Sequence, residues 1–213
     1  MTELLDALHQ PHLQLFLRLV LGGLLLLAGV TKLADRRAFY EAVVDYEVLP
    51  SRWERPFAYL LPFAETALGL LLLLGLGTTA AAALAVPLFA SFGIAIGVNV
   101  ARGRHVDCHC FGAVHREEIG WPALLRSFAL ALGALVVAAG ASRFGAVEAA
   151  LLGSSEDLPA AAEVIPIVFL AAVVFDVLVL LPEAVAFRAG FARAFAPRPA
   201  AGHAHHHNGA RTA

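Results

Sequence analysis

Charged residues and cysteines are both scarce in this chain of 213 residues. Charged residues make up only 15% of the chain and hydrophobic residues 60%, whereas about 25% of the residues in a typical soluble domain are charged. Together with a mean hydropathy of +0.76, this composition predicts a membrane protein. The formal net charge of −2 and the lack of a basic stripe interleaved with aromatic residues exclude nucleic acid as an expected partner.

The amino terminus lacks the basic segment with which a cleavable signal peptide begins. Glu3 and Asp6 are acidic, and no Lys or Arg precedes Arg18. We therefore expect the first apolar run to remain in the bilayer as an anchor.

Five apolar runs are long enough to cross a bilayer, which takes about 20 residues of helix. They cover residues 13–33, 57–76, 80–98, 121–141 and 164–187. In a water-free environment only helix satisfies the backbone of such runs, so the predicted fold is all-α, a polytopic transmembrane bundle of four core helices plus a fifth. The short segment 75–79 predicts an antiparallel hairpin between the second and third helices.

The predicted organisation has five parts. They are an amino-terminal segment (1–12), a four-helix membrane domain (13–141), a loop (142–162), a fifth transmembrane helix (163–187) and a His-rich tail (188–213). The tail is of low complexity and is predicted to be disordered.

Basic residues gather on one predicted face of the membrane. That face receives Lys32, Arg36, Arg37, Arg52, Arg55, Arg102, Arg104, Arg116, Arg188, Arg193, Arg198 and Arg211, and the other face receives Arg143. Cytoplasmic loops are enriched in Lys and Arg. This rule predicts an amino terminus outside the cell, with the loop around residue 108 and the tail in the cytoplasm of a bacterial inner membrane.

A short amphipathic helix is predicted between the first two spans. Phe39, Val43 and Tyr46 recur at the spacing i, i+4, i+7, with charged residues on the opposite face and a stop at Pro50. The pattern fits a helix lying in the membrane interface, and it fits equally an ordinary surface helix that covers the bundle.

Four of the spans contain an ionisable residue. These residues are Arg18, Glu65, Arg126 and Asp176. Each would cost at least about 2.5 kcal/mol at the bilayer centre, so each is expected to face the bundle interior.

Helical rise places Glu65 roughly 12 Å and Arg126 roughly 7 Å along their helices from the same membrane face. Lys32 leaves its span on that face, so we expect Glu65 to form a buried ion pair with Arg126 or with Lys32. Glu65 either stabilises helix packing or, as a desolvated carboxyl group, relays protons to nearby thiols. Arg18 and Asp176 have no predicted partner.

The only two cysteines, Cys108 and Cys110, flank His109 in a polar loop between the third and fourth spans. A disulfide between residues i and i+2 closes a small ring against its preferred geometry, and strained disulfides are the readily reduced ones. Cations within eight residues favour the thiolate form. They are Arg102, Arg104, His105, His109, His115 and Arg116. The loop therefore predicts redox-active thiols.

Two other interpretations of the loop stay open. A copper or zinc site would use His105, Cys108, His109, Cys110 and His115, although the cysteine spacing is not the C-x₂₋₄-C of structural zinc sites. A structural pair of inert cysteines is the other interpretation.

Several motifs resemble those of a known family. They are Ala-Gly-Val-Thr-Lys-Leu at 28–33, Tyr-Glu-Val-Leu-Pro at 46–50, Leu-Pro-Phe-Ala-Glu at 61–65 and Asp-Cys-His-Cys-Phe-Gly at 107–112, which leads to Ile-Gly-Trp at 119–121. Over residues 13–141 the chain resembles the MauE branch of the MauE/DoxX membrane proteins. The C-x-C-F-G loop between the third and fourth spans is the most specific element.

The resemblance implies a multi-pass inner-membrane protein of methylamine utilisation. Such a protein would help to process, transport or mature the small (β) subunit of methylamine dehydrogenase, and its redox partners would be thioredoxin-like proteins. By position, Cys108 and Cys110 become the thiol pair. The other motif positions are Lys32, Pro50, Glu65, Phe111 and Gly112, and we add His109 and Arg126 as supporting residues.

The expected activity is thiol–disulfide exchange by a helper protein rather than by a stand-alone enzyme. Disulfides of exported proteins form outside the cytoplasm, whereas the charge pattern places Cys108 and Cys110 inside. A relay across the membrane would need a second electron acceptor, either a quinone or a partner protein. The alternatives are a copper- or zinc-binding transporter or metallochaperone that uses the loop and the His-rich tail, and a structural membrane scaffold.

Overall fold

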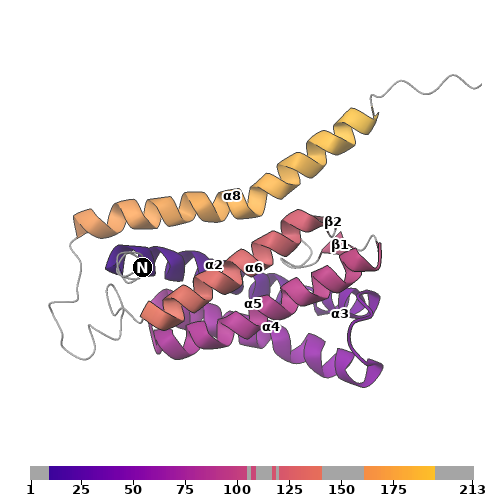
Figure 1. Cartoon of the computed structure of the whole chain (residues 1–213), viewed down its shortest axis with the longest axis horizontal. Coiled ribbons are helices and arrows are strands. Elements are labelled where there is room, and N and C mark those ends of the chain that lie inside the picture. Colours follow the sequence, from indigo (N-terminus) through magenta and orange to yellow (C-terminus); the bar gives the residue numbers. More distant parts are fainter. Residues whose placement is uncertain (1–9, 105–106, 109–116, 119, 141–160, 195–213) are drawn as a thin grey trace, which may run out of the picture.

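The computed structural model of the chain describes residues 10–104, 107–108, 117–118, 120–140 and 161–194, with side chains for 10–104, 120–140 and 162–179. In chain order the elements are α2 (Pro11–Ala34), α3 (Arg36–Asp45), α4 (Ser51–Leu74), α5 (Thr78–Ala101), β1 (Asp107–Cys108), β2 (Glu117–Glu118), α6 (Trp121–Gly140) and α8 (Ala161–Ala194). The described residues form five long helices that run along the molecule, and the short α3 lies at the end where α2 finishes and α4 begins (Figure 1).

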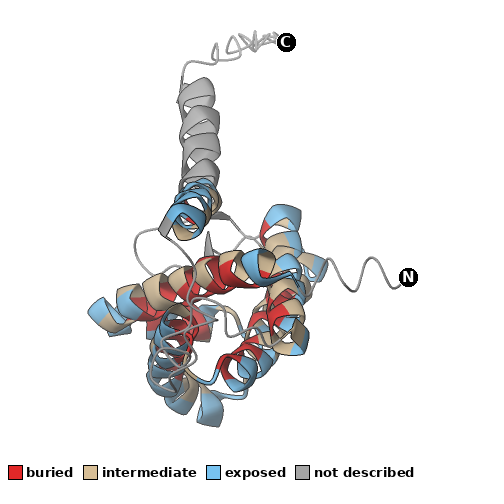
Figure 2. Ribbon diagram, turned by 90° about the vertical axis from the view of Figure 1, so that its left-hand side faces the viewer, coloured by how far each residue is buried: buried red, intermediate tan, exposed pale blue. Residues whose placement is uncertain are grey.

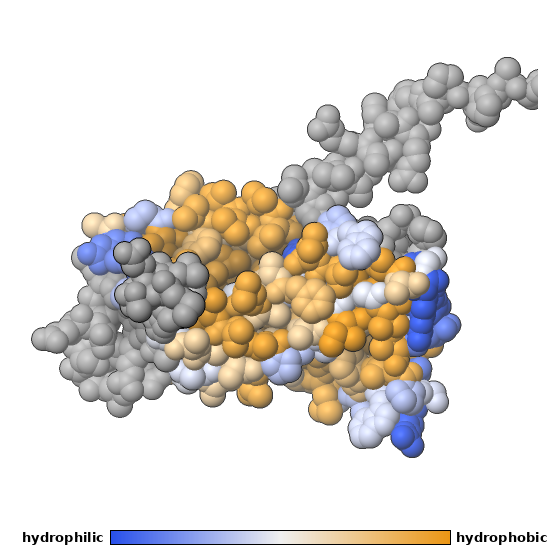
Figure 3. Space-filling view, viewed as in Figure 1, coloured by the Kyte–Doolittle hydropathy of each residue, from blue (hydrophilic) through white to orange (hydrophobic). Residues whose placement is uncertain are grey.

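The described helices confirm the predicted all-α membrane bundle. α2, α4, α5, α6 and the segment Ala162–Val179 of α8 are each long and apolar enough to span a bilayer. Figure 3 shows an apolar surface along the bundle, with hydrophilic residues gathered at the end that holds α3 and the start of α4. The chain is therefore a multi-pass membrane protein.

The core lies between α2, α4, α5 and α6. Leu21, Leu72, Ala85 and Val137 face one another there and are almost fully buried, whereas Leu132 on the outer side of α6 is 62% exposed. Figure 2 shows the buried residues on the inward faces of these helices. Since lipid is as apolar as leucine, close packing rather than hydrophobic burial holds such helices together.

Glycines allow α2 and α4 to pack backbone against backbone. A Cβ atom on Gly69 would lie 2.6 Å from the backbone nitrogen of Leu26, and one on Gly22 would lie 3.0 Å from the carbonyl oxygen of Gly69. One on Gly29 would lie 2.8 Å from the carbonyl oxygen of Pro62. No side chain fits at these three positions, so α2 and α4 are held at the distance that brings Lys32 to Glu65.

The helix boundaries differ most from the predicted ones at the start of α4 and at the ends of α8. α4 begins at Ser51, six residues before the predicted span, because Pro50 in an extended conformation caps the helix before the apolar run starts. α8 covers Ala161–Ala194, so it begins before residue 163 and continues through residues 188–194, which the sequence had assigned to the tail. Hydropathy marks the apolar part of a helix, not its polar ends.

The hairpin between α4 and α5 is confirmed. α4 ends at Leu74 and is capped by Gly75, which adopts a left-handed conformation with φ of 69°, and α5 begins after Gly77, which has φ of 55°. Such conformations cost little at glycine, so two glycines within three residues suffice to reverse the chain.

The short helix α3 is amphipathic, as predicted. Phe39 and Val43 are buried against α4, while Arg37 and Glu41 form an exposed ion pair with 3.0 Å between Nε and Oε1. The helix starts where the backbone nitrogen of Ala38 donates to Oδ1 of Asp35. It ends at Asp45, so Tyr46 lies in the cap rather than on the helix.

The fifth membrane helix, α8, packs mainly on α2. Ala171 and Val179 are buried against Val20, Leu24 and Ala28, and Figure 2 shows α8 to one side of the other helices.

The prediction that every ionisable residue in a span faces the interior is wrong for one residue. Asp176 is exposed, because α8 contacts the bundle along one side and leaves most of its circumference outside. Arg18 on α2 is only 2% exposed, and Arg126 on α6 is half-buried.

Candidate functional site

Lys32 and Glu65 form a buried ion pair between α2 and α4. The Lys32 Nζ atom lies 2.5 Å from Oε1 of Glu65, and the two side chains are 2% and 0% exposed. The sequence left Arg126 and Lys32 as candidate partners for Glu65, and the structure pairs the carboxylate with Lys32. Burying two charges is tolerable only when they compensate each other, as they do here.

Two aromatic rings complete the environment of the ammonium group. Nζ of Lys32 lies 5.1 Å from the ring centroid of Phe39 and 5.0 Å from that of Phe92. Both distances are within the range of cation–π attraction. One carboxylate and two rings, from α4, α3 and α5, thus stabilise a charge at the end of α2.

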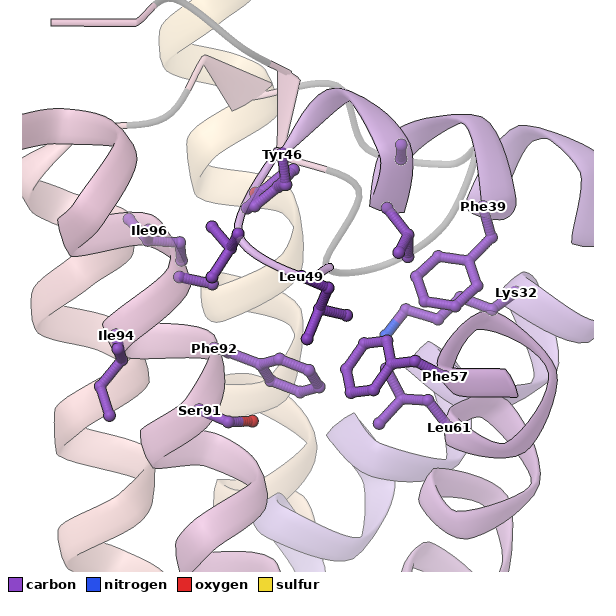
Figure 4. Close-up of a pocket in the computed structure, with 14 residues that line it drawn as sticks. Lys32, Phe39, Tyr46, Leu49, Phe57, Leu61, Ser91, Phe92, Ile94 and Ile96 are labelled. Atoms are coloured by element: carbon purple, nitrogen blue, oxygen red, sulfur yellow. The ribbon is translucent and has the colours of Figure 1, made fainter. Parts of the chain in front are cut away.

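Beside this ion pair lies an apolar cavity of about 270 Å³. Its wall is built from α2, α3, α4, α5 and the segment that joins α3 to α4. Among the described residues of the wall, Lys32 is the one ionisable residue apart from the Tyr46 phenol. Figure 4 shows Phe39, Phe57, Phe92 and Leu49 gathered around the end of the Lys32 side chain. The site therefore combines the Lys32 ammonium, whose charge Glu65 compensates, with an apolar cavity lined by aromatic rings.

Asn99 on α5 anchors the segment that follows α3 at the edge of the cavity. Its side chain is fully buried, and Nδ2 donates to the carbonyl oxygen of Tyr46 at 3.1 Å and to that of Ala95 at 3.0 Å. Nearby, Nη1 of Arg102 donates to the carbonyl oxygen of Glu47 at 3.1 Å. Sequence reasoning missed Asn99, although an amide inside an apolar run was the available signal.

Tyr46 lies in the joining segment at the edge of the cavity, outside the spans. Burial raises the pKa of the Tyr46 phenol above its usual range, because the phenolate form would lose its hydration. The phenol therefore stays neutral at physiological pH.

Glu65 also reaches a second, much smaller cavity of about 30 Å³, which it lines together with Arg126 and Ser127. Within the part of the chain whose side chains are described, Oε2 of Glu65 has no hydrogen-bond partner. Glu65 and Arg126 therefore lie near each other, as predicted, since both side chains line this smaller cavity.

Cys108 lies in β1, which pairs antiparallel with β2 so that Asp107 is opposite Glu118 and Cys108 is opposite Glu117. Figure 1 shows the two strands at the end of the bundle that also holds α3. Lys32, in the last turn of α2, lies at the same end of the bundle.

Six predicted site residues fall outside the described residues. They are His105, His109, Cys110, Phe111, Gly112 and His115. The described residues contain no group of three His, Cys, Asp or Glu side chains placed to hold a metal ion. Four of the five predicted copper or zinc ligands lie outside the described residues, and the fifth, Cys108, lies in β1.

Most of the chain is similar in sequence to known membrane proteins. A family model described as methylamine utilisation protein MauE matches residues 10–141. The chain belongs to the MauE family. The match spans α2 to α6, including the ion pair, the cavity and both strands, and it ends before α8.

Individual relatives agree with the family match. The chain is 38% identical over 133 residues to the methylamine utilization protein MauE of Methylophilus methylotrophus, an alignment that covers 62% of this chain and 70% of the relative. It is 35% identical over 136 residues to the MauE protein of Paracoccus denitrificans, which covers 63% and 73%. No solved structure is significantly similar to the chain.

Proposed function

We propose that this MauE-family protein serves methylamine utilisation as a membrane-bound helper in the disulfide maturation of an exported protein. By resemblance, that client is the small subunit of methylamine dehydrogenase, a thioredoxin-like protein acts as redox partner, and the location is the bacterial inner membrane. The observation that carries the proposal is the position of Cys108. Its strand lies at the end of the bundle where the Lys32–Glu65 pair and the apolar cavity are found.

The exchange involves the thiol pair alone. A disulfide between Cys108 and Cys110 is attacked by a thiolate of the thioredoxin-like partner that relays electrons from the client, and a second thiolate of that partner then resolves the mixed disulfide. The partner, and through it the client, gains one disulfide, and Cys108 and Cys110 become thiols. Two electrons and two protons must then leave the pair before the next cycle.

The basic residues at this end support the predicted orientation, with the cysteine loop on the cytoplasmic side. Arg36, Arg37, Arg52 and Arg55 are all exposed at the end of the bundle that holds α3. An electron relay then has to connect the loop to an exported client, so a membrane-soluble or protein acceptor is part of the proposal.

Replacement of Cys108 by serine tests the proposed function. In cells that depend on the protein for a mature methylamine dehydrogenase small subunit, we expect Cys108→Ser and Cys110→Ser each to reduce the disulfide-bonded client at least tenfold in a thiol-alkylation gel assay. Arg37→Ala, in an exposed surface pair, is the matched control and should leave the client unchanged. Full maturation with Cys108→Ser would refute the proposal.

A further inference from the structure

The cavity beside Lys32 has the size of a small-molecule site. Its volume of about 270 Å³ lies near the lower end of the range of about 300–1,000 Å³ that is usual for ligand pockets. The space suits one ring with short substituents rather than a folded lipid or a peptide. A neutral ligand fits best, because Glu65 already compensates the charge of Lys32.

The wall of the cavity favours a flat ligand. Phe39, Phe57 and Phe92 come from three different helices and surround the same space with Tyr46 (Figure 4). Aromatic rings gain from offset-stacked or edge-on contact with another ring. A saturated acyl chain would gain no such contact.

The Lys32 ammonium lies at the inner end of this apolar wall and can donate hydrogen bonds. A lysine ammonium has three donors, and one of them is directed at Oε1 of Glu65. A ligand that carries a carbonyl oxygen would satisfy another N–H of Lys32 in a place where water has little access.

The cavity is open toward the lipid. Ile94 on α5 lines it and is 58% exposed, and Val48 lines it from the segment between α3 and α4 and is 36% exposed. An apolar tail attached to a bound ring can leave the cavity along these side chains and enter the bilayer. The ligand can therefore arrive from the membrane phase.

We infer that this cavity binds the head group of a membrane quinone, with a ring carbonyl accepting from Lys32 and the isoprenoid tail lying in lipid. A quinone is flat and neutral, carries carbonyl acceptors and dissolves in the bilayer, so it meets each property of the wall. Quinone binding does not depend on the thiols.

The use of the quinone as electron acceptor rests on the proposed function. In that step Cys108 and Cys110 lose two protons and two electrons and form their disulfide. The quinone takes up both and leaves as the quinol. The step supplies the acceptor that an isolated cysteine pair needs.

The test is photolabelling of the full-length protein in phosphatidylcholine nanodiscs with a short-chain azido-ubiquinone. We expect the label on peptides of α3 and α5, with at least tenfold less labelling when Ala95→Phe fills the cavity. Ala83→Phe, the same substitution at an exposed position on α5 outside the cavity, is the control and should label as the wild type does. If Ala95→Phe does not fold, Ser91→Phe, at an exposed position of the wall, takes its place.

Equal labelling of Ala95→Phe and Ala83→Phe would overturn the inference. So would loss of the label when phosphatidylglycerol is added at the concentration at which unlabelled quinone displaces the label, since an anionic phospholipid would then be the occupant. The Cys108→Ser/Cys110→Ser protein separates the two proposals. It should bind quinone like the wild type while failing to mature the client, whereas Ala95→Phe should lose quinone binding with its thiols intact.

Discussion

At the scale of single residues, the central feature is a lysine ammonium buried beside a carboxylate and two rings. Burial of a charged side chain away from water costs several kcal/mol unless a partner compensates the charge. Lys32 offsets that cost by its contacts with Glu65, Phe39 and Phe92. The sequence could indicate the depth of Glu65 but not its partner, because depth says nothing about the direction in which a helix turns its side chain.

Removal of one member of the pair should cost more than removal of both. We expect Lys32→Met or Glu65→Leu alone to lower the free energy of unfolding by about 3–5 kcal/mol, since each leaves a buried charge without its partner. The double variant should lose less than either single variant. Unfolding by sodium dodecyl sulfate, followed by circular dichroism in mixed micelles, measures these differences.

The exposed pair of Arg37 and Glu41 is the control for this cycle. Its removal should change the free energy of unfolding by at most about 0.5 kcal/mol, because water solvates both partners. A double Lys32→Met/Glu65→Leu variant that is less stable than both single variants would contradict the pairing.

Asn99 offers a second prediction at this scale. Asn99→Leu should destabilise the protein by about 1–3 kcal/mol, because the carbonyl oxygen of Tyr46 loses its donor from α5. The control is Ser127→Ala, whose hydroxyl group donates only within its own helix to the carbonyl oxygen of Ala123. Equal stability losses in the two variants would show that Asn99 does not anchor the segment after α3.

At the scale of elements, the contact between α2 and α4 positions the site. Gly22, Gly29 and Gly69 let the two backbones meet, and the meeting point determines which residues of α2 reach Glu65. α3 then covers the site with Phe39 and Val43. The sequence predicted that α3 exists and is amphipathic, but the rings that face Lys32 depend on how α3 packs on α4 and α5.

A methyl group at the contact of α2 and α4 should separate the helices. Gly69→Ala is expected to cost about 1–3 kcal/mol in the same unfolding assay, because its Cβ would overlap backbone atoms that cannot move aside. Gly133→Ala on α6 is the control, since its Cβ would have only ordinary contacts at 3.8 Å with Leu17 and 3.9 Å with Leu21. A Gly69→Ala protein as stable as Gly133→Ala would argue against this close packing.

At the scale of the whole molecule, the chain consists of a bundle that matches the MauE family and a further helix beside it. The family match ends at residue 141, and α8 contacts the bundle chiefly through α2. In lipid, apolar surface that loses a helix partner is covered by acyl chains at little cost. The bundle is therefore expected to hold its site without α8.

A chain that ends at residue 141 tests this independence. We expect this shorter chain to insert into the membrane and to purify as a single species. Lys32→Met should lower its free energy of unfolding by an amount within about 1 kcal/mol of the loss in the full chain, since Lys32 contacts α3, α4 and α5. A truncated chain in which Lys32→Met has no effect on unfolding would show that α8 is needed to form the ion pair.

The orientation in the membrane is the second prediction at this scale. A membrane-impermeant maleimide should label Cys108 and Cys110 of reduced cells only after the inner membrane is permeabilised, because the basic residues predict a cytoplasmic loop. A cysteine introduced at Thr79, at the exposed opposite end of the bundle, should show the reverse pattern and serves as the control. Labelling of the native cysteines in intact cells would invert the topology and place them on the side of the exported client.

The sequence by itself determined the number of membrane helices, the amphipathic α3, the hairpin at Gly75 and Gly77, and the family. These properties follow from run length, periodicity and short motifs, all of which are local in the chain. The tertiary structure alone decided that Lys32 is the partner of Glu65, that aromatic rings from α3, α4 and α5 line a cavity, and that Asp176 is exposed. Those features depend on how each helix is rotated about its axis and where helices cross. Lys32 and Glu65 are 33 residues apart in the chain, and run length and local periodicity did not determine the rotation that brings them together.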